Sequence, residues 1–103
     1  MDYDKIKKLT KEKKILITDH AWEAIDKREI STKEVISVIL NGEIIEEYKE
    51  DKPCPSSLIL GFVGSRSIHV LVALCKEHIR IITTYEPDAA KWVDYRFRKK
   101  EGK

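Results

Sequence analysis

The sequence predicts one α+β domain in which helices pack on a curled, antiparallel sheet of four to five strands, followed by a C-terminal helix. Three observations support this class. Helical spacing of apolar residues is found in the first 42 residues and again after Pro87. The segment from 43 to 85 changes to the period of two that strands show. A chain of 103 residues is the size of one domain, so residues 1–103 are assigned to a single unit.

The N-terminal region predicts two short helices with a strand between them. Apolar residues three apart among lysines favour an amphipathic helix over residues 3–13. The sequence KILIT at residues 14–18 predicts a short strand. Asp19 can then cap a helix over residues 20–28.

A further helix is expected to begin at residues 31–33. Ser31 and Glu34 have the spacing of a capping box, and Asn41-Gly42 is a good helix stop. Four apolar residues share one face, as a helix lying on a sheet requires. They are Val35, Ile36, Ile39 and Leu40.

Four strands are expected to follow one another in the second half of the chain. The loop over residues 49–57 contains Pro53 and Pro55, and short turns are expected at residues 64–67 and 76–77. Isoleucine and threonine are frequent in the last strand, as a pleated surface prefers. The expected strands are residues 43–48, 57–63, 68–75 and 78–85.

The chain is expected to end in a helix that begins at Pro87. Proline suits the first turn of a helix, and Asp88 would lie near its positive end. Trp92 is expected to anchor the packing of this helix. Three further residues share its apolar face, namely Ala89, Val93 and Phe97.

Charge is abundant but nearly balanced. Charged residues make up 37% of the chain, yet the net charge is only +2 and the isoelectric point is about 8.5. This balance neither indicates nor excludes a nucleic-acid-binding protein. Basic residues gather at 1–14 and 96–103, whereas 43–51 is acidic. These segments are either solvated surfaces or two basic ends that converge on a phosphate-bearing ligand.

Several classes of protein are not expected. The longest apolar run, Val70–Cys75, is too short to span a membrane, and the N-terminus lacks the apolar region of a secretory signal. Two cysteines without a paired framework favour a reducing compartment, with the cytoplasm as the default. The sequence has no CxxC pair, no ligand-spaced histidines and no glycine-rich phosphate loop. Neither a metal nor a cofactor is therefore expected, although Cys54 between its two prolines could be an exposed thiol.

His20 and Arg28 are the first candidates for chemistry. They lie eight residues apart, so they occupy roughly similar sides of the expected helix over 20–28. The helix dipole disfavours a cationic histidine at an N-terminus, which suits a neutral imidazole acting as a base. The ordinary alternative is a solvent-facing histidine without a chemical role.

His69 and Tyr85 are the second pair of candidates. His69 lies in the middle of an expected strand, where a general acid or base on the sheet face is one interpretation. A buried histidine held by one hydrogen bond is the other. Tyr85 ends the last expected strand, a position where sites often lie, but tyrosine is also common at the rim of a core.

The order and spacing of several segments resemble a known family, the domain of unknown function numbered 4258. The similarity extends over about residues 18–98. In the first half the matching residues are His20-Ala21, Arg28, Ile30-Ser31, Val35 and the run NGEIIEEY at 41–48. In the second half they are PSSLILG at 55–61, IHV at 68–70, IITTYEPD at 81–88 and Trp92.

This resemblance implies a RelE-like fold, because the family looks like a distant relative of the RelE, BrnT and MqsR toxins. It also implies messenger-RNA cleavage and an antitoxin encoded nearby, for which a YgiT-type zinc-finger protein is a candidate. Two positions depart from the family pattern. An arginine often follows the histidine by four residues, where this chain has Ala24, and a glycine often follows the next arginine, where it has Glu29. Lys27 is a candidate to replace the missing arginine.

The resulting hypothesis is a metal-independent endoribonuclease of a toxin–antitoxin pair. His20 and His69 would serve as base and acid, unassigned between them, and Tyr85 would orient a phosphate or share the acid role. Arg28, with Lys27, would clamp the phosphate. The basic end would hold the RNA backbone through Arg96, Arg98 and Lys99.

The alternative hypothesis is a non-catalytic protein- or RNA-binding module of the same fold, in which His69 is structural. Convergence of His20, Arg28 and His69 within about 7–10 Å would favour catalysis, since one phosphate must reach all three. A sealed His69 would favour the module. The expected partners are RNA, an antitoxin and a second copy of the chain. The two protein partners are expected to pair with an exposed edge of the sheet, which would be residues 58–63 if that strand lies at an edge.

Overall fold

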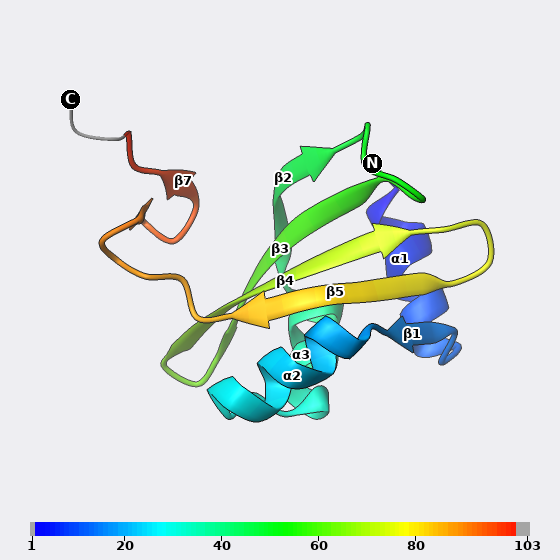
Figure 1. The fold of residues 1–103 in the computed structure, drawn as a ribbon, viewed down its shortest axis with the longest axis horizontal. Coiled ribbons are helices and arrows are strands. Elements are labelled where there is room, and N and C mark those ends of the chain that lie inside the picture. The colour runs from blue at the N-terminus through cyan, green and yellow to red at the C-terminus, as the bar shows by residue number, and fades with distance from the viewer. Residues whose placement is uncertain (1, 101–103) are drawn as a thin grey trace.

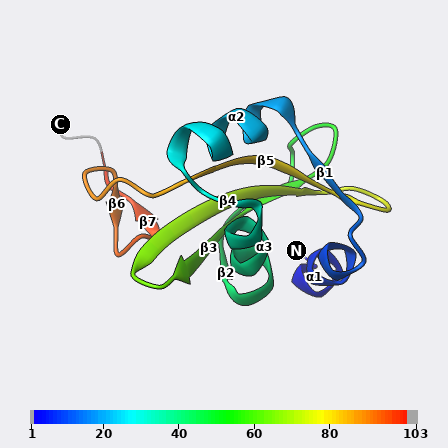
Figure 2. The same ribbon diagram turned by 90° about the horizontal axis from the view of Figure 1, so that it is seen from below.

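A curled five-stranded sheet forms the centre of the molecule, and its helices lie against one face (Figures 1 and 2). The computed structural model describes residues 2–100. The helices are α1 (Tyr3–Lys11), α2 (Asp19–Arg28) and α3 (Thr32–Asn41). The strands are β1 (Ile15–Ile17), β2 (Glu43–Tyr48), β3 (Ser56–Val63), β4 (Arg66–Leu74), β5 (Ile79–Tyr85), β6 (Trp92–Val93) and β7 (Phe97–Arg98).

The large sheet has the strand order β1-β5-β4-β3-β2. The four strands from β2 to β5 pair antiparallel in chain order, as predicted. The expectation of a wholly antiparallel sheet is wrong at one edge, because β1 pairs parallel to β5, with Ile15 opposite Ile79. The three apolar residues of β1 do not indicate which strand they pair with, so the sequence did not predict the position of β1 in the sheet. The sheet edges are β1 and β2, and the apolar strand β3 is interior.

The helix ends follow the capping rules with one shift. The side chain of Thr18, rather than Asp19, caps α2 by accepting a hydrogen bond from the backbone of Ala21. The capping box at the start of α3 is confirmed, because Ser31 and Glu34 exchange both hydrogen bonds. These caps fix where the two helices start on the face of the sheet.

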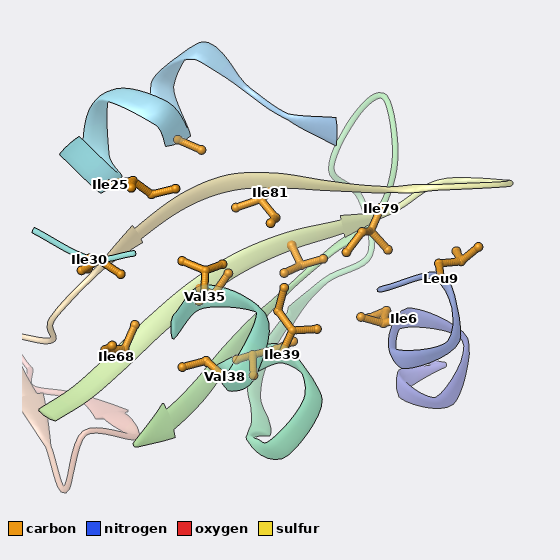
Figure 3. Packing of buried hydrophobic residues seen from close by; sticks show 14 residues of the cluster. Ile6, Leu9, Ile25, Ile30, Val35, Val38, Ile39, Ile68, Ile79 and Ile81 are labelled. Atoms are coloured by element: carbon orange, nitrogen blue, oxygen red, sulfur yellow. The ribbon is translucent and has the colours of Figure 1, made fainter. Parts of the chain in front are cut away.

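The core fills the space between the helices and one sheet face (Figure 3). Alternate residues of the central strands point into it, as the period of two predicts. Gly61 of β3 allows α3 to approach closely, since a Cβ at this position would lie 3.0 Å from the Cα of Val38. The largest core side chains from the sheet are Ile59, Ile68, Val70, Val72, Ile79 and Ile81, and those from the helices include Ile6, Ile25, Val35, Val38 and Ile39.

The predicted C-terminal helix is wrong, and residues 92–98 form a β-hairpin instead, here called the C-terminal hairpin (Figure 1). One turn does begin at Asp88, whose carbonyl oxygen accepts hydrogen bonds from two backbone N–H groups. The chain then reverses, because Asp94 and Tyr95 have φ values of 53° and 60° and the N–H of Arg96 donates to the carbonyl of Val93. Two left-handed residues give the turn that suits a hairpin.

The two cysteines are joined, so the expectation of unpaired thiols is wrong. Cys54 and Cys75 form a disulfide with their Cα atoms 5.3 Å apart. The bond ties the loop over residues 49–55 to the end of β4. Their separation of 21 residues gave no indication of this pairing. Within residues 2–100, no helix is long and apolar enough to cross a membrane.

Candidate functional site

The face of the sheet opposite the helices carries a trough of 340 Å³. Its floor is a row of cross-strand neighbours in which Leu58 pairs with Leu71 and Leu71 pairs with Thr83. These residues point away from the core because their strand neighbours point into it. The rim of the trough is more polar and consists of Tyr48, Asp51, Tyr85 and Arg98.

A second depression, of 370 Å³, lies beside the trough. Arg28 reaches it from the last turn of α2, and Lys91 reaches it from the turn before the C-terminal hairpin. Tyr85 and Arg98 line both hollows and therefore mark the boundary between them. The rest of the lining comes from Glu86, Asp88 and Trp92. Three cations and two carboxylates thus surround the second depression.

His69 lies beneath this boundary and has no exposed surface. The C-terminal hairpin covers it. The ring of Trp92 meets the imidazole edge to face, with centroids 4.6 Å apart. Nε2 of His69 lies 2.7 Å from the carbonyl oxygen of Tyr95, and Nδ1 lies 3.3 Å from the hydroxyl of Tyr85. Both ring nitrogens of His69 are therefore occupied by the protein.

The hydrogen-bond partners of His69 determine its tautomer. A carbonyl oxygen only accepts, so Nε2 carries the proton and donates it to Tyr95, and Nδ1 accepts from the hydroxyl of Tyr85. Burial lowers the pKa of His69, although the carbonyl of Tyr95 partly opposes this. Burial also raises the pKa of Tyr85, against smaller opposing effects of Arg98 and Arg28. Tyr85 is thus a neutral proton donor beside a neutral imidazole.

The arginines of the C-terminal hairpin bind two glutamates of β2. Arg96 pairs with Glu43 at 2.9 Å and lowers the pKa of that carboxyl group, mainly through the hydrogen bond. Arg98 pairs with Glu46 at 3.0 Å, and its guanidinium also lies over the ring of Trp92. These contacts fasten the hairpin to the edge strand of the sheet. The acidic band and the basic end of the sequence thus meet each other.

The other predicted site residues lie elsewhere. His20 is exposed in the first turn of α2, about 12 Å along the helix axis from Arg28, and lines neither hollow. Lys27 is exposed and also lines neither hollow. Lys99 is exposed just after β7. The structure therefore brings together His69, Tyr85, Arg28 and Arg98, and it leaves His20 apart.

Sequence reasoning missed Tyr48, Asp51 and Lys91. Tyr48 ends its strand as Tyr85 does, and the same strand-end argument could have found it. Asp51 and Lys91 lie in connecting segments, where only the folded chain shows what they face. Among residues 2–100, no group of three or more histidine, cysteine or acidic residues could hold a metal ion.

Comparison with known families gives one match. The model of a domain of unknown function, DUF4258, matches residues 17–86, about two thirds of the chain. The chain belongs to the DUF4258 family. The match spans Arg28, His69 and Tyr85 and ends before the C-terminal hairpin. Neither a curated protein nor a solved structure gives a significant match.

The structure also explains one departure from the DUF4258 pattern. Glu29 ends α2 with a φ of 55°, in the left-handed region that glycine adopts without steric cost. The glycine that the resemblance leads us to expect at this position would suit such a helix end, and Glu29 lines neither hollow. Ala24, the other departure, is buried in α2.

Proposed function

We propose that this protein is a metal-independent endoribonuclease of the RelE-like toxin type, with Tyr85 at the centre of the reaction. One observation carries the proposal. The hydroxyl of Tyr85 is held by His69 at the boundary between two hollows, where Arg98 lines both hollows and Arg28 lines the second depression. A neutral donor that shares a depression with two guanidinium groups suits the cleavage of a phosphodiester.

The proposed cleavage is an internal transfer of the phosphoryl group from the 5′-oxygen to the 2′-oxygen. The 2′-hydroxyl oxygen of RNA attacks the adjacent phosphorus, and its proton leaves to water, since His69 is buried and His20 lies away from both hollows. The bond to the 5′-oxygen breaks. The hydroxyl of Tyr85 exchanges its hydrogen bond to Nδ1 of His69 for one to that oxygen and donates its proton there. The products are a 2′,3′-cyclic phosphate and a 5′-hydroxyl. Solvent then returns a proton to Tyr85.

The cations have separate roles in this scheme. Arg28 stabilises the charge that develops on the phosphorane, because its guanidinium presents two parallel N–H donors. Arg98, whose Nε and Nη2 atoms are held by Glu46, adds its positive charge. Lys91 adds charge to the second depression. Lys99 extends the basic surface toward the RNA backbone, whereas Arg96 is held by Glu43 and Asp94. His69 acts through Tyr85 as a positioning residue.

The proposed toxin also requires a partner that silences it. We propose a cognate antitoxin, with a YgiT-type zinc-finger protein as the candidate, that pairs with an open edge of the sheet. The available edges are β1 and β2, since β3 lies between its neighbours and cannot accept another strand. A second copy of the chain could use the same edges. The expected site of action is the cytoplasm, where a messenger-RNA substrate would be found. The cysteines no longer support this expectation, because Cys54 and Cys75 form a disulfide.

The test compares two tyrosine variants on labelled RNA. Tyr85→Phe should lower cleavage by about 10²-fold or more while RNA binding is kept, since one acid group is lost. Tyr3→Phe is the matched control, because its hydroxyl bonds to Ile39 away from the open face. The assay contains a chelator, which excludes a contaminating metal nuclease, and is run with and without ribosomes. Cleavage by Tyr85→Phe at the parent rate would overturn the proposal.

A second function is favoured by the burial of His69. With both ring nitrogens occupied and His20 elsewhere, the same face is suited to binding RNA or protein without chemistry. In that case the parent binds RNA and yields no cyclic phosphate product. Growth arrest on induced expression, relieved by the neighbouring gene, would favour the toxin instead.

A further inference from the structure

The trough has a second polar end that the proposed cleavage does not use. Asp51 lies there, in the loop between β2 and β3. Its backbone N–H donates to the carbonyl of Tyr48, and its Oδ2 accepts from the hydroxyl of the fully buried Ser56. The disulfide of Cys54 then fastens the loop to β4. An exposed carboxylate is therefore held in a fixed position at the rim.

Arg98 gives the same trough a donor. Its Nε and Nη2 atoms are bound by Glu46 and by the hydroxyl of Tyr48. Its Nη1 atom has no hydrogen-bond partner among residues 2–100 and is free to donate to a ligand. The contacts of Nε and Nη2 thus orient the guanidinium, and Nη1 is left to bind a ligand.

The floor between these two groups is apolar. Leu58 and Leu71 form it with the side chain of Thr83, and the rings of Tyr48 and Tyr85 are half-buried at the rim. Its 340 Å³ lies within the range of small-molecule sites. An apolar floor with aromatic rims accepts the face of a planar ring. Asp51 and Arg98 determine which ring binds, because Asp51 requires hydrogen-bond donors on one edge of the ring and Arg98 requires acceptors on another.

We propose that the trough is a nucleobase site that prefers guanine. Guanine presents two adjacent donors, N1–H and the 2-amino group, which match the two oxygens of the Asp51 carboxylate. Its other edge presents the acceptors O6 and N7, to which the free Nη1 of Arg98 can donate. Guanine is thus the base that gives a carboxylate donors and an arginine acceptors at the same time.

The other bases fit this pair of groups less well. Adenine turns the acceptor N1 toward a carboxylate, and uracil offers a single N–H between two acceptors. Cytosine offers one amino group beside the acceptor N3. Each places a lone pair against the charge of Asp51, which costs affinity.

The inference rests on the proposed function only for its natural ligand, which would be a guanine next to the cleaved phosphate. The site itself is tested with free nucleotides. We would titrate the protein with guanosine, adenosine, cytidine and uridine 5′-monophosphates and follow amide shifts by NMR. Guanosine monophosphate should bind roughly tenfold or more tightly than the others, the scale of one bidentate base contact.

Two variants identify the residues responsible. Asp51→Asn keeps the shape but removes the charge, and it should abolish the guanine preference. Asp26→Asn, exposed on α2, is the matched control and should change nothing. Thr83→Tyr fills the floor with a residue that strands favour, and it should block all four nucleotides. Circular dichroism must show that each variant is folded.

Equal binding of the four nucleotides, no binding of any, or a preference that survives in folded Asp51→Asn would overturn the inference. RNA oligonucleotides with and without guanine separate it from the proposed function. Cleavage without a guanine preference would contradict the guanine site and support the nuclease. A guanine preference without RNA cleavage would support the guanine site and contradict the nuclease.

Discussion

The imidazole of His69 and the indole of Trp92 meet at 88°, with their centroids 4.6 Å apart, on the side of the sheet away from the helices. Trp92 is 7% exposed and His69 is fully covered. The C-terminal hairpin therefore contributes a small second core that encloses a polar group. A histidine in this setting links the stability of the fold to pH.

Acidification should destabilise the protein through His69. Burial lowers its pKa in the folded state, so the unfolded chain binds the proton more readily. The stability that neutral His69 contributes is complete above about pH 6.5 and is lost as the pH falls from there toward the lower folded pKa. Urea unfolding midpoints at a series of pH values should fall less steeply for His69→Gln than for the parent. His20→Gln is the control, and equal slopes for the parent and His69→Gln would contradict the prediction.

Replacing the two adjacent cations of α2 should have unequal effects on cleavage. Arg28 lines the depression beside Tyr85, whereas Lys27 does not. Arg28→Ala should lower the rate on labelled RNA by about 10²-fold, the scale of one charge stabiliser, and Lys27→Ala should leave it nearly unchanged. Equal losses in both variants would show that α2 contributes only general positive charge.

Lys99→Ala should weaken RNA binding modestly and in a manner that depends on salt. Lys99 is exposed beyond β7, so its contribution would be a single screened phosphate contact. A plot of log affinity against log salt should lose about one unit of slope. Fluorescence anisotropy with labelled RNA measures this. An unchanged slope would place Lys99 outside the RNA path.

Glu29→Gly should stabilise the fold. Glu29 has a φ of 55°, a conformation that costs roughly 1–2 kcal/mol for a residue with a Cβ and little for glycine. Its carbonyl, which accepts from Arg66, is kept in the variant. Denaturant unfolding should show a gain of about 1 kcal/mol, and Glu29→Ala should show no such gain. A loss of stability in Glu29→Gly would mean that chain entropy outweighs the relief of strain.

Local signals predicted most of the fold. Ser31 with Glu34 placed the start of α3, and the period of two placed four strands in order, because these signals act between near neighbours. Pro87 and Asp88 carried a genuine helix-start signal that produced only one turn. The reversal at Asp94 and Tyr95 contains no glycine and depends on distant contacts, including that of Tyr95 with His69. Such contacts are invisible to a local pattern.

The candidate site was predicted in part for the same reason. Tyr85 and His69 lie on strands that were predicted to follow each other in the chain, and the structure pairs the two residues directly. Asp51 joined them only through its loop and the disulfide of Cys54, whose partner the spacing could not reveal. His20 was grouped with Arg28 by helical periodicity, which gives the side of a helix but ignores the distance along it.

The parallel pairing of β1 with β5 has a consequence for the order of assembly. Leu16 pairs with Arg80, nearly two thirds of the chain later. Contacts of such high sequence separation require a large loop to close and so slow the search for the native topology. During synthesis β1 would leave the ribosome early and wait, with Leu16 still 45% exposed even in the finished fold, until β5 emerges. The N-terminal edge therefore cannot pair before residues 79–85 have been made, and a nascent chain stalled before residue 79 would present it unpaired to chaperones.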